Sequence, residues 1–137
     1  MPSRLPEAHL VNPDPAALLP HRYPFLLLDT ILFREPGVAA SATTRITFDA
    51  VPFPRVLMVE AMAQLAGVAS GCGEGEGGFL ATIDRAELLG DPLPGDTLLI
   101  AVRVVKGFGR LFLLEGEVTA NERQLATATL TLGIGAI

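Results

Sequence analysis

Two polar side chains interrupt an otherwise apolar segment near the middle of this 137-residue chain. Residues 53–67 read FPRVLMVEAMAQLAG, in which Glu60 and Gln64 stand four residues apart. On a helix this spacing places both side chains on one face. A carboxylate can serve as a general acid or base, whereas an amide cannot trade protons near neutral pH and is suited only to orienting its neighbour. The alternative is a polar pair that is satisfied inside a core or a subunit interface.

Other kinds of chemistry find little support in the sequence. His9 and His21 lie 12 residues apart, without the C-x-x-C or H-E-x-x-H spacing of metal ligands, so no metal is expected. Cys72 is the single cysteine and has no histidine nearby, which argues against a nucleophile. The tract GCGEGEGG at 71–78 lacks the Lys-Ser/Thr ending of a phosphate loop and carries two glutamates. It is therefore interpreted as a flexible loop.

Length and composition predict one domain over residues 1–137. Half of the residues are hydrophobic and the mean hydropathy is +0.45, yet no apolar run approaches the roughly 20 residues of a membrane-spanning helix. The N-terminal segment lacks the apolar core of a secretory signal, so we expect a cytoplasmic protein. The net charge of −5, with 10 dispersed Lys and Arg residues, argues against nucleic-acid binding.

Periodicity predicts an α+β fold in which an antiparallel sheet wraps around one long helix. The helix follows Pro54, runs to about Ser70 and is apolar on nearly all sides, which is typical of a buried helix. Asp14 and Pro15 are suited to starting a short helix that ends at Pro20. Strands are expected at 25–33, 38–48, 79–89, 97–106, 111–120 and 124–134, with short turns joining the last four into a meander.

Three segments resemble one enzyme family. They are LLPHRYPFLLLD at 18–29, VLMVEAMAQLAG at 56–67 and FLATIDRAELLGDPLPGD at 79–96. In this order and spacing they are similar to motifs of the 3-hydroxyacyl-[acyl-carrier-protein] dehydratases of fatty-acid synthesis. The resemblance implies a hot-dog fold and a homodimer whose sheets join edge to edge, with active sites at the interface. It also implies possible further assembly into a hexamer, a trimer of dimers.

The resemblance also assigns roles to residues. In these lyases a histidine and a glutamate from opposite subunits flank the substrate, and the matching glutamate is Glu60. A backbone N–H at the head of the helix binds the thioester oxygen, and the matching position is Arg55. The remaining substrate contacts implied are Val56, Gln64, Phe79 and Leu80, and the residues implied to shape the site are His21, Tyr23, Pro24 and Pro54. No cofactor is implied.

One part of the family pattern is missing. The family histidine stands about fourteen residues before the glutamate, and that count reaches Ile46, within ITFDAVPFPRV. Neither histidine of the family motif is present, and the loop that normally carries them is shortened. The glycine between Pro54 and Val56 has become Arg55, whose side chain we expect to crowd or recharge the mouth of the site. His21 is interpreted as structural, and His9 as a solvated residue.

Three functions follow from this comparison. The first is a dehydratase-like enzyme that converts 3-hydroxyacyl to trans-2-enoyl thioesters of acyl carrier protein or coenzyme A. The second is a non-catalytic acyl-binding or accessory subunit, in a heteromer with a histidine-bearing homologue. The third is an acyl thioesterase that uses Glu60. Docking of an acidic carrier protein needs local positive charge, for which the candidates are Arg55, Arg85, Arg103, Lys106 and Arg110.

Overall fold

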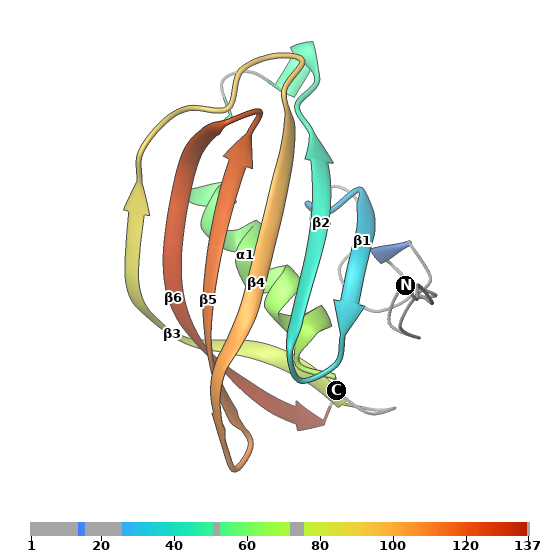
Figure 1. Ribbon diagram of the computed structural model, residues 1–137, viewed down its shortest axis with the longest axis vertical. Helices are drawn as coiled ribbons and strands as arrows, with labels where there is room; N and C mark the ends of the chain where they lie inside the picture. Colours follow the sequence, from blue (N-terminus) through green and yellow to red (C-terminus); the bar gives the residue numbers. More distant parts are fainter. Residues whose placement is uncertain (1–13, 16–25, 51–52, 72–75, 137) are drawn as a thin grey trace, which may run out of the picture.

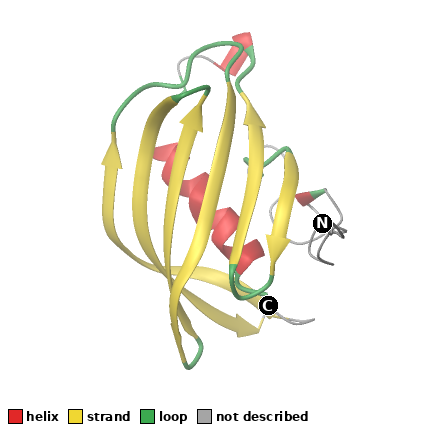
Figure 2. Cartoon of the chain, in the orientation of Figure 1, coloured by secondary structure: helices red, strands yellow, loops and turns green. Residues whose placement is uncertain are grey.

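A six-stranded antiparallel sheet curves around one long helix in the computed structural model (Figures 1 and 2). The structure describes residues 14–15, 26–50, 53–71 and 76–136. The elements are β1 (Thr30–Glu35), β2 (Ala39–Arg45), the 3-10 helix η3 (Phe48–Ala50), α1 (Val56–Ala69), β3 (Glu76–Leu88), β4 (Thr97–Phe108), β5 (Leu111–Ala120) and β6 (Arg123–Ala136). The predicted α+β class is confirmed, and so is the order of two strands, one helix and four strands.

The ends of some elements differ from the expectation. The segment Leu26–Asp29 precedes β1 as irregular chain instead of belonging to it, and β3 begins at Glu76, inside the tract interpreted as a loop. The predicted short helix near the N-terminus lies mostly outside the described residues. No helix in the described part of the chain is long and apolar enough to cross a membrane.

The position of β3 in the sheet corrects the predicted meander. The strand order is β1-β2-β4-β5-β6-β3, so β3 pairs with β6 at one edge and does not touch β4. The connection 89–96 crosses the end of the sheet, because its start is bonded to β6 and its end to the segment after β2. Leu89 N–H donates to Leu125 C=O, and Gly95 N–H donates to Ile46 C=O. A connection of this length reaches a distant strand, whereas a tight turn would not.

Helix α1 fills the hollow of the curved sheet (Figure 1). The buried residues of the helix are Met58, Val59, Ala61, Met62, Gln64, Leu65, Ala66, Val68 and Ala69. On the sheet, burial alternates along β4, where Leu98, Ile100 and Val102 are buried between exposed neighbours. This period of two is expected of a strand with one face on a core. The helix is therefore buried on most sides, and Val56 and Glu60 are its exposed residues.

The turn between β1 and β2 caps the carboxyl end of α1. Arg34 Nε donates to the carbonyl of Val68 (2.9 Å), and Gly37 N–H donates to the carbonyl of Ala69 (2.7 Å). Both carbonyls belong to the last turn, which lacks intrahelical partners, and the guanidinium charge also complements the helix dipole. Gly71 then leaves the helix with a φ of 73°, a conformation that glycine adopts at no steric cost.

Gly71 is expected to be more sensitive to substitution than other left-handed glycines. A Cβ at Gly71 would lie 2.9 Å from Pro36 Cβ, whereas a Cβ at Gly109, whose φ is 64°, would meet open space. Gly109→Ala should therefore cost only the conformational term of about 1–2 kcal/mol. Gly71→Ala should lower the free energy of unfolding by more than this, as measured by urea denaturation. Equal losses in the two variants would contradict the close packing of the helix end on the β1–β2 turn.

Candidate active site

The two polar residues of α1 are in contact, as their spacing predicts. Glu60 lies in the second turn with its side chain exposed, and Gln64 Nε2 donates to Glu60 Oε1 over 3.3 Å. Gln64 itself is only 2% exposed. The pair therefore joins a buried amide to a carboxylate that solvent or a bound molecule can reach.

Gln64 also holds the segment that precedes β1. Its Oε1 accepts a hydrogen bond from Leu27 N–H (2.9 Å), and the carbonyl of Leu27 accepts one from Thr44 Oγ1 (2.6 Å). Leu27 belongs to the first of the three motif segments, and Thr44 lies on β2. The helix, the first motif and the sheet thus meet at a single buried amide, a connection that the sequence spacing alone does not reveal.

The amino end of α1 begins with short-range hydrogen bonds. Leu57 N–H donates to Pro54 C=O (3.0 Å) and Met58 N–H donates to Arg55 C=O (2.9 Å). The N–H groups at the head of a helix have no carbonyl partner within the helix and favour negative charge. The predicted role of the Arg55 amide in binding a thioester oxygen stays a prediction. Val56 is 62% exposed beside it, so this end of the helix is accessible.

The Arg55 side chain turns onto the connection after β3. Its Nε donates to Asp91 Oδ1 (2.6 Å) and its Nη2 to Asp91 Oδ2 (3.2 Å), while Nη1 donates to the carbonyl of Leu88 (3.2 Å). The hydrogen bond from Arg55 holds the pKa of Asp91 below its ordinary value of 3.8, and the charge of the guanidinium adds to this. The same hydrogen bond raises the pKa of Arg55. The Asp91 carboxylate therefore balances the charge of the Arg55 guanidinium.

The segment that would carry the family histidine begins with a buried residue and continues with exposed ones. Ile46 is 1% exposed, and its N–H donates to Asp96 C=O (2.8 Å). After it, Thr47 Oγ1 donates to Asp49 Oδ1 of η3 (2.7 Å), and this bond lowers the pKa of Asp49. Ile46 is thus a core residue whose side chain cannot exchange protons. His9, His21, Tyr23, Pro24 and Cys72 lie outside the described residues.

Phe79 and Leu80, the predicted acyl-chain contacts, lie on the edge strand β3. The side chain of Phe79 is 56% exposed and that of Leu80 is 36% exposed. The Phe79 ring covers Gly133 and Gly135 of β6, and a Cβ at Gly133 would lie 2.5 Å from the ring. These two glycines were not among the predicted site residues. The G-x-G at 133–135 is the sequence feature that indicates a close approach of another group to this part of β6.

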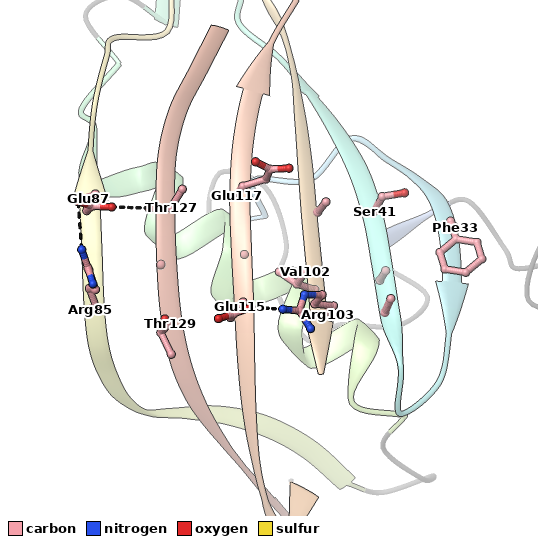
Figure 3. Close-up of a pocket in the computed structure, with 15 residues that line it drawn as sticks. Phe33, Ser41, Arg85, Glu87, Val102, Arg103, Glu115, Glu117, Thr127 and Thr129 are labelled. Carbon is pink, nitrogen blue, oxygen red and sulfur yellow. Dashed lines mark hydrogen bonds and ion pairs between the residues drawn. The ribbon is translucent and has the colours of Figure 1, made fainter. Parts of the chain in front are cut away.

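A pocket in the described part of the structure lies elsewhere. It measures about 700 Å³ and is lined by residues of all six strands and none of α1. In Figure 3 its labelled charged and hydroxyl side chains project from the face of the sheet that is turned away from the helix, whereas Val102 belongs to the buried face. Arg103 pairs there with Glu115, and Arg85 pairs with Glu87. Thr127 and Thr129, which alternate along β6, also line this pocket.

The five basic residues considered for carrier-protein docking are spread over three places. Arg55 is at the head of α1. Arg85 and Arg103 are on the face of the sheet that is turned away from α1, called the outer face below. Lys106 lies near the end of β4, and Arg110 lies in the β4–β5 turn. Four of them form ion pairs, since Arg110 Nη2 also bonds Glu76 (2.6 Å). The pairing cancels much of the positive field that would attract an acidic partner. Among the described residues no group of three metal-ligating side chains occurs.

Curated relatives at more than 30% identity cover most of the chain. A 3-hydroxyacyl-[acyl-carrier-protein] dehydratase FabZ of Desulforamulus reducens is 37% identical over 131 residues, which are 86% of this chain and 92% of that protein. The chain belongs to the 3-hydroxyacyl-[acyl-carrier-protein] dehydratase family. The FabZ of Campylobacter hominis is 32% identical over 129 residues, 82% of this chain and 89% of that protein. No family model matches the chain.

Solved structures confirm the hot-dog fold of this family member. The dehydratase heterocomplex ApeI:P of Xenorhabdus doucetiae contains a chain that superposes with a TM-score of 0.75 at 21% identity, covering 90% of this chain and 91% of that one. A hot-dog-like protein of Thermanaerovibrio acidaminovorans superposes with a TM-score of 0.61 at 15% identity, covering 72% and 81%. At these identities the likeness establishes the fold alone.

The Arg55–Asp91 pair predicts a pH-dependent contribution to stability. Because the pKa of Asp91 is lower in the folded chain than in the unfolded chain, the pair stabilises the fold above the ordinary carboxyl titration near pH 4. The contribution is lost as the pH falls through the folded pKa of Asp91. Arg55→Met should therefore reduce the free energy of unfolding at pH 7 and have little effect at about pH 2.

Arg103→Met is the matched control, since it removes an ion pair on the outer face and leaves Asp91 untouched. NMR titration should place the pKa of Asp91 below its ordinary value in the wild type and in Arg103→Met. It should return toward that value in Arg55→Met. An Asp91 pKa that is the same in all three proteins would rule out the pair in solution.

Proposed function

We propose that this cytoplasmic family member is a dehydratase-type subunit that acts on 3-hydroxyacyl thioesters, with Glu60 as its acid. The observation that carries the proposal is the Glu60–Gln64 contact on the family's helix. In the forward reaction a base removes a proton alpha to the thioester carbonyl. The Glu60 carboxyl gives its proton to the 3-hydroxyl, which leaves as water, and the trans-2-enoyl thioester remains. In the reverse direction Glu60 takes the proton back from water.

The edge strand β3 supports assembly into a dimer, because it presents apolar side chains to solvent. Phe79, Leu80, Ile83, Leu88 and Leu89 are each at least 36% exposed, and β3 pairs only with β6 within the described sheet. A long apolar edge invites pairing with another chain. We propose that β3 pairs with a second hot-dog subunit. The contact between Arg55 and Leu88 places the head of α1 at the end of this strand, so the partner would border the candidate site.

The second candidate function is a heteromer in which another subunit supplies the base. The sequence between β2 and α1 contains no histidine, and Ile46 occupies the position reached by the family spacing. A neighbour in fold is a chain of a dehydratase heterocomplex. In such an assembly this chain would contribute Glu60 and the acyl-binding surface, and the homologue would contribute the histidine.

An assay of hydration and dehydration tests the proposal directly. The purified chain, alone and mixed with a histidine-bearing homologue, is given 3-hydroxyacyl and trans-2-enoyl thioesters of carrier protein and of coenzyme A. We expect interconversion in at least one assembly. We also expect Glu60→Gln to lower kcat by roughly a hundredfold or more, since a positioned acid contributes about 10²–10⁴-fold. Turnover only in the mixture supports the heteromer.

Two outcomes would refute the proposal. Equal turnover by the wild type and Glu60→Gln in every assembly would exclude Glu60 as the acid. Release of free thiol without any enoyl product would show a thioesterase instead. The mass of the protein in solution checks the interface, because a stable monomer under assay conditions would contradict a shared site.

A further inference from the structure

We propose that Gln64 is a positioning residue for the Glu60 carboxylate. The fixed backbone of Leu26–Asp29 orients the Gln64 amide, and the amide determines which oxygen of the carboxylate exchanges a proton. This inference deepens the proposed function of Glu60 and rests on it. Its basis is a chain of three hydrogen bonds that runs from Thr44 on β2 through the Leu27 peptide and the Gln64 amide to Glu60.

The Leu27 peptide is fixed at both of its polar groups. Its N–H donates to Gln64 and its carbonyl accepts from Thr44, which is 6% exposed. The same segment is tied to β2 two residues later, where Asp29 N–H donates to Thr43 C=O (2.8 Å) and Asp29 Oδ2 accepts from Arg45 N–H (2.6 Å). The donor that faces Gln64 is therefore held by the sheet and does not move independently of it.

This fixed donor determines the orientation of the Gln64 amide. A backbone N–H can only donate, so the Gln64 atom that faces Leu27 must be the carbonyl oxygen, Oε1. The amide nitrogen, Nε2, then faces Glu60 and can only donate to it. Since Gln64 is 2% exposed, a flipped amide would leave its buried NH₂ group facing the Leu27 N–H, two donors without an acceptor between them, which is costly. The direction of both hydrogen bonds follows from the backbone.

The consequence falls on Glu60. The oxygen that accepts from Gln64, Oε1, cannot present a proton toward that N–H group. Because the hydrogen bond from Gln64 occupies one lone pair of Oε1, we assign the proton that Glu60 gives to a 3-hydroxyl, or takes from water, to the other oxygen, Oε2. Gln64 touches no reacting atom in this scheme, and its effect on the reaction passes through the position of the carboxylate.

Three variants separate this role from simple support of the core. Gln64→Leu removes the hydrogen bonds of the amide to Leu27 and Glu60. Gln64→Glu keeps an acceptor for Leu27 N–H but cannot donate to Glu60 when both carboxylates are ionised. Ser70→Ala removes a different helix hydrogen bond, from Ser70 Oγ to the carbonyl of Gly67 (2.8 Å), and serves as the control.

NMR without substrate provides the direct readout. Hydrogen exchange at Leu27 N–H should become up to about tenfold faster in Gln64→Leu, the size expected from losing one hydrogen bond, and should stay slow in Gln64→Glu and Ser70→Ala. The carboxyl carbon resonance of Glu60, assigned with Glu60→Gln, should shift in both Gln64 variants and not in Ser70→Ala. If Gln64→Leu does not fold, the combination of slow Leu27 exchange and a shifted Glu60 signal in Gln64→Glu decides the question.

Kinetics test the consequence for the reaction. In an assembly that turns over, Gln64→Glu should lower kcat by roughly ten- to a hundredfold with KM within about twofold, because a displaced catalytic group slows chemistry more than binding. A Glu60 resonance that does not shift in Gln64→Glu would overturn the inference. An unchanged kcat in Gln64→Glu, with a Glu60 resonance that does shift, would also overturn it. Absence of turnover in the wild type would refute the proposed function instead, and the resonances would still decide whether Gln64 positions Glu60.

Discussion

The packing of one helix inside a curved sheet is the constraint on which the rest of the structure depends. Because strands surround α1, nearly every side of the helix must be apolar. A polar side chain in it is tolerated only where its hydrogen bonds are satisfied. Gln64 meets this condition through Leu27 and Glu60. The hydrogen bonds that satisfy the buried Gln64 amide thus hold the first motif segment against the helix. They also hold the Glu60 carboxylate beside the amide.

The helix is held at both ends by side chains from other elements. At the amino end the Arg55 guanidinium bridges to Asp91 and the Leu88 carbonyl. At the carboxyl end Arg34 and Gly37 satisfy the last carbonyls. With its ends fixed to β3 and to the β1–β2 turn, α1 has little freedom to rotate or slide. The proposed acid Glu60, in its second turn, would gain accuracy from rigid elements of this kind.

The electrostatics of the surface bear on the choice of partner. Most basic residues considered for docking are paired with carboxylates, and the chain carries a net charge of −5. An acidic carrier protein would therefore find weak attraction on the described surface. The apolar edge of β3 is the more prominent contact surface. Together these features agree better with the proposed pairing of β3 with another subunit than with docking of an acidic protein on the described surface.

Local patterns in the sequence were sufficient to predict that two strands precede the helix. They also predicted the helix itself, observed from Val56 to Ala69, the bounds of β5 and the shared face of Glu60 and Gln64. These features depend on residues close together in the chain, so periodicity reveals them. The tertiary structure alone decided the place of β3 beside β6, the partner of Arg55 and the bond from Leu27 to Gln64. The last two join residues 36 and 37 positions apart. Contacts over such separations depend on how the chain closes around the helix, and the residue types at either end do not encode that geometry locally.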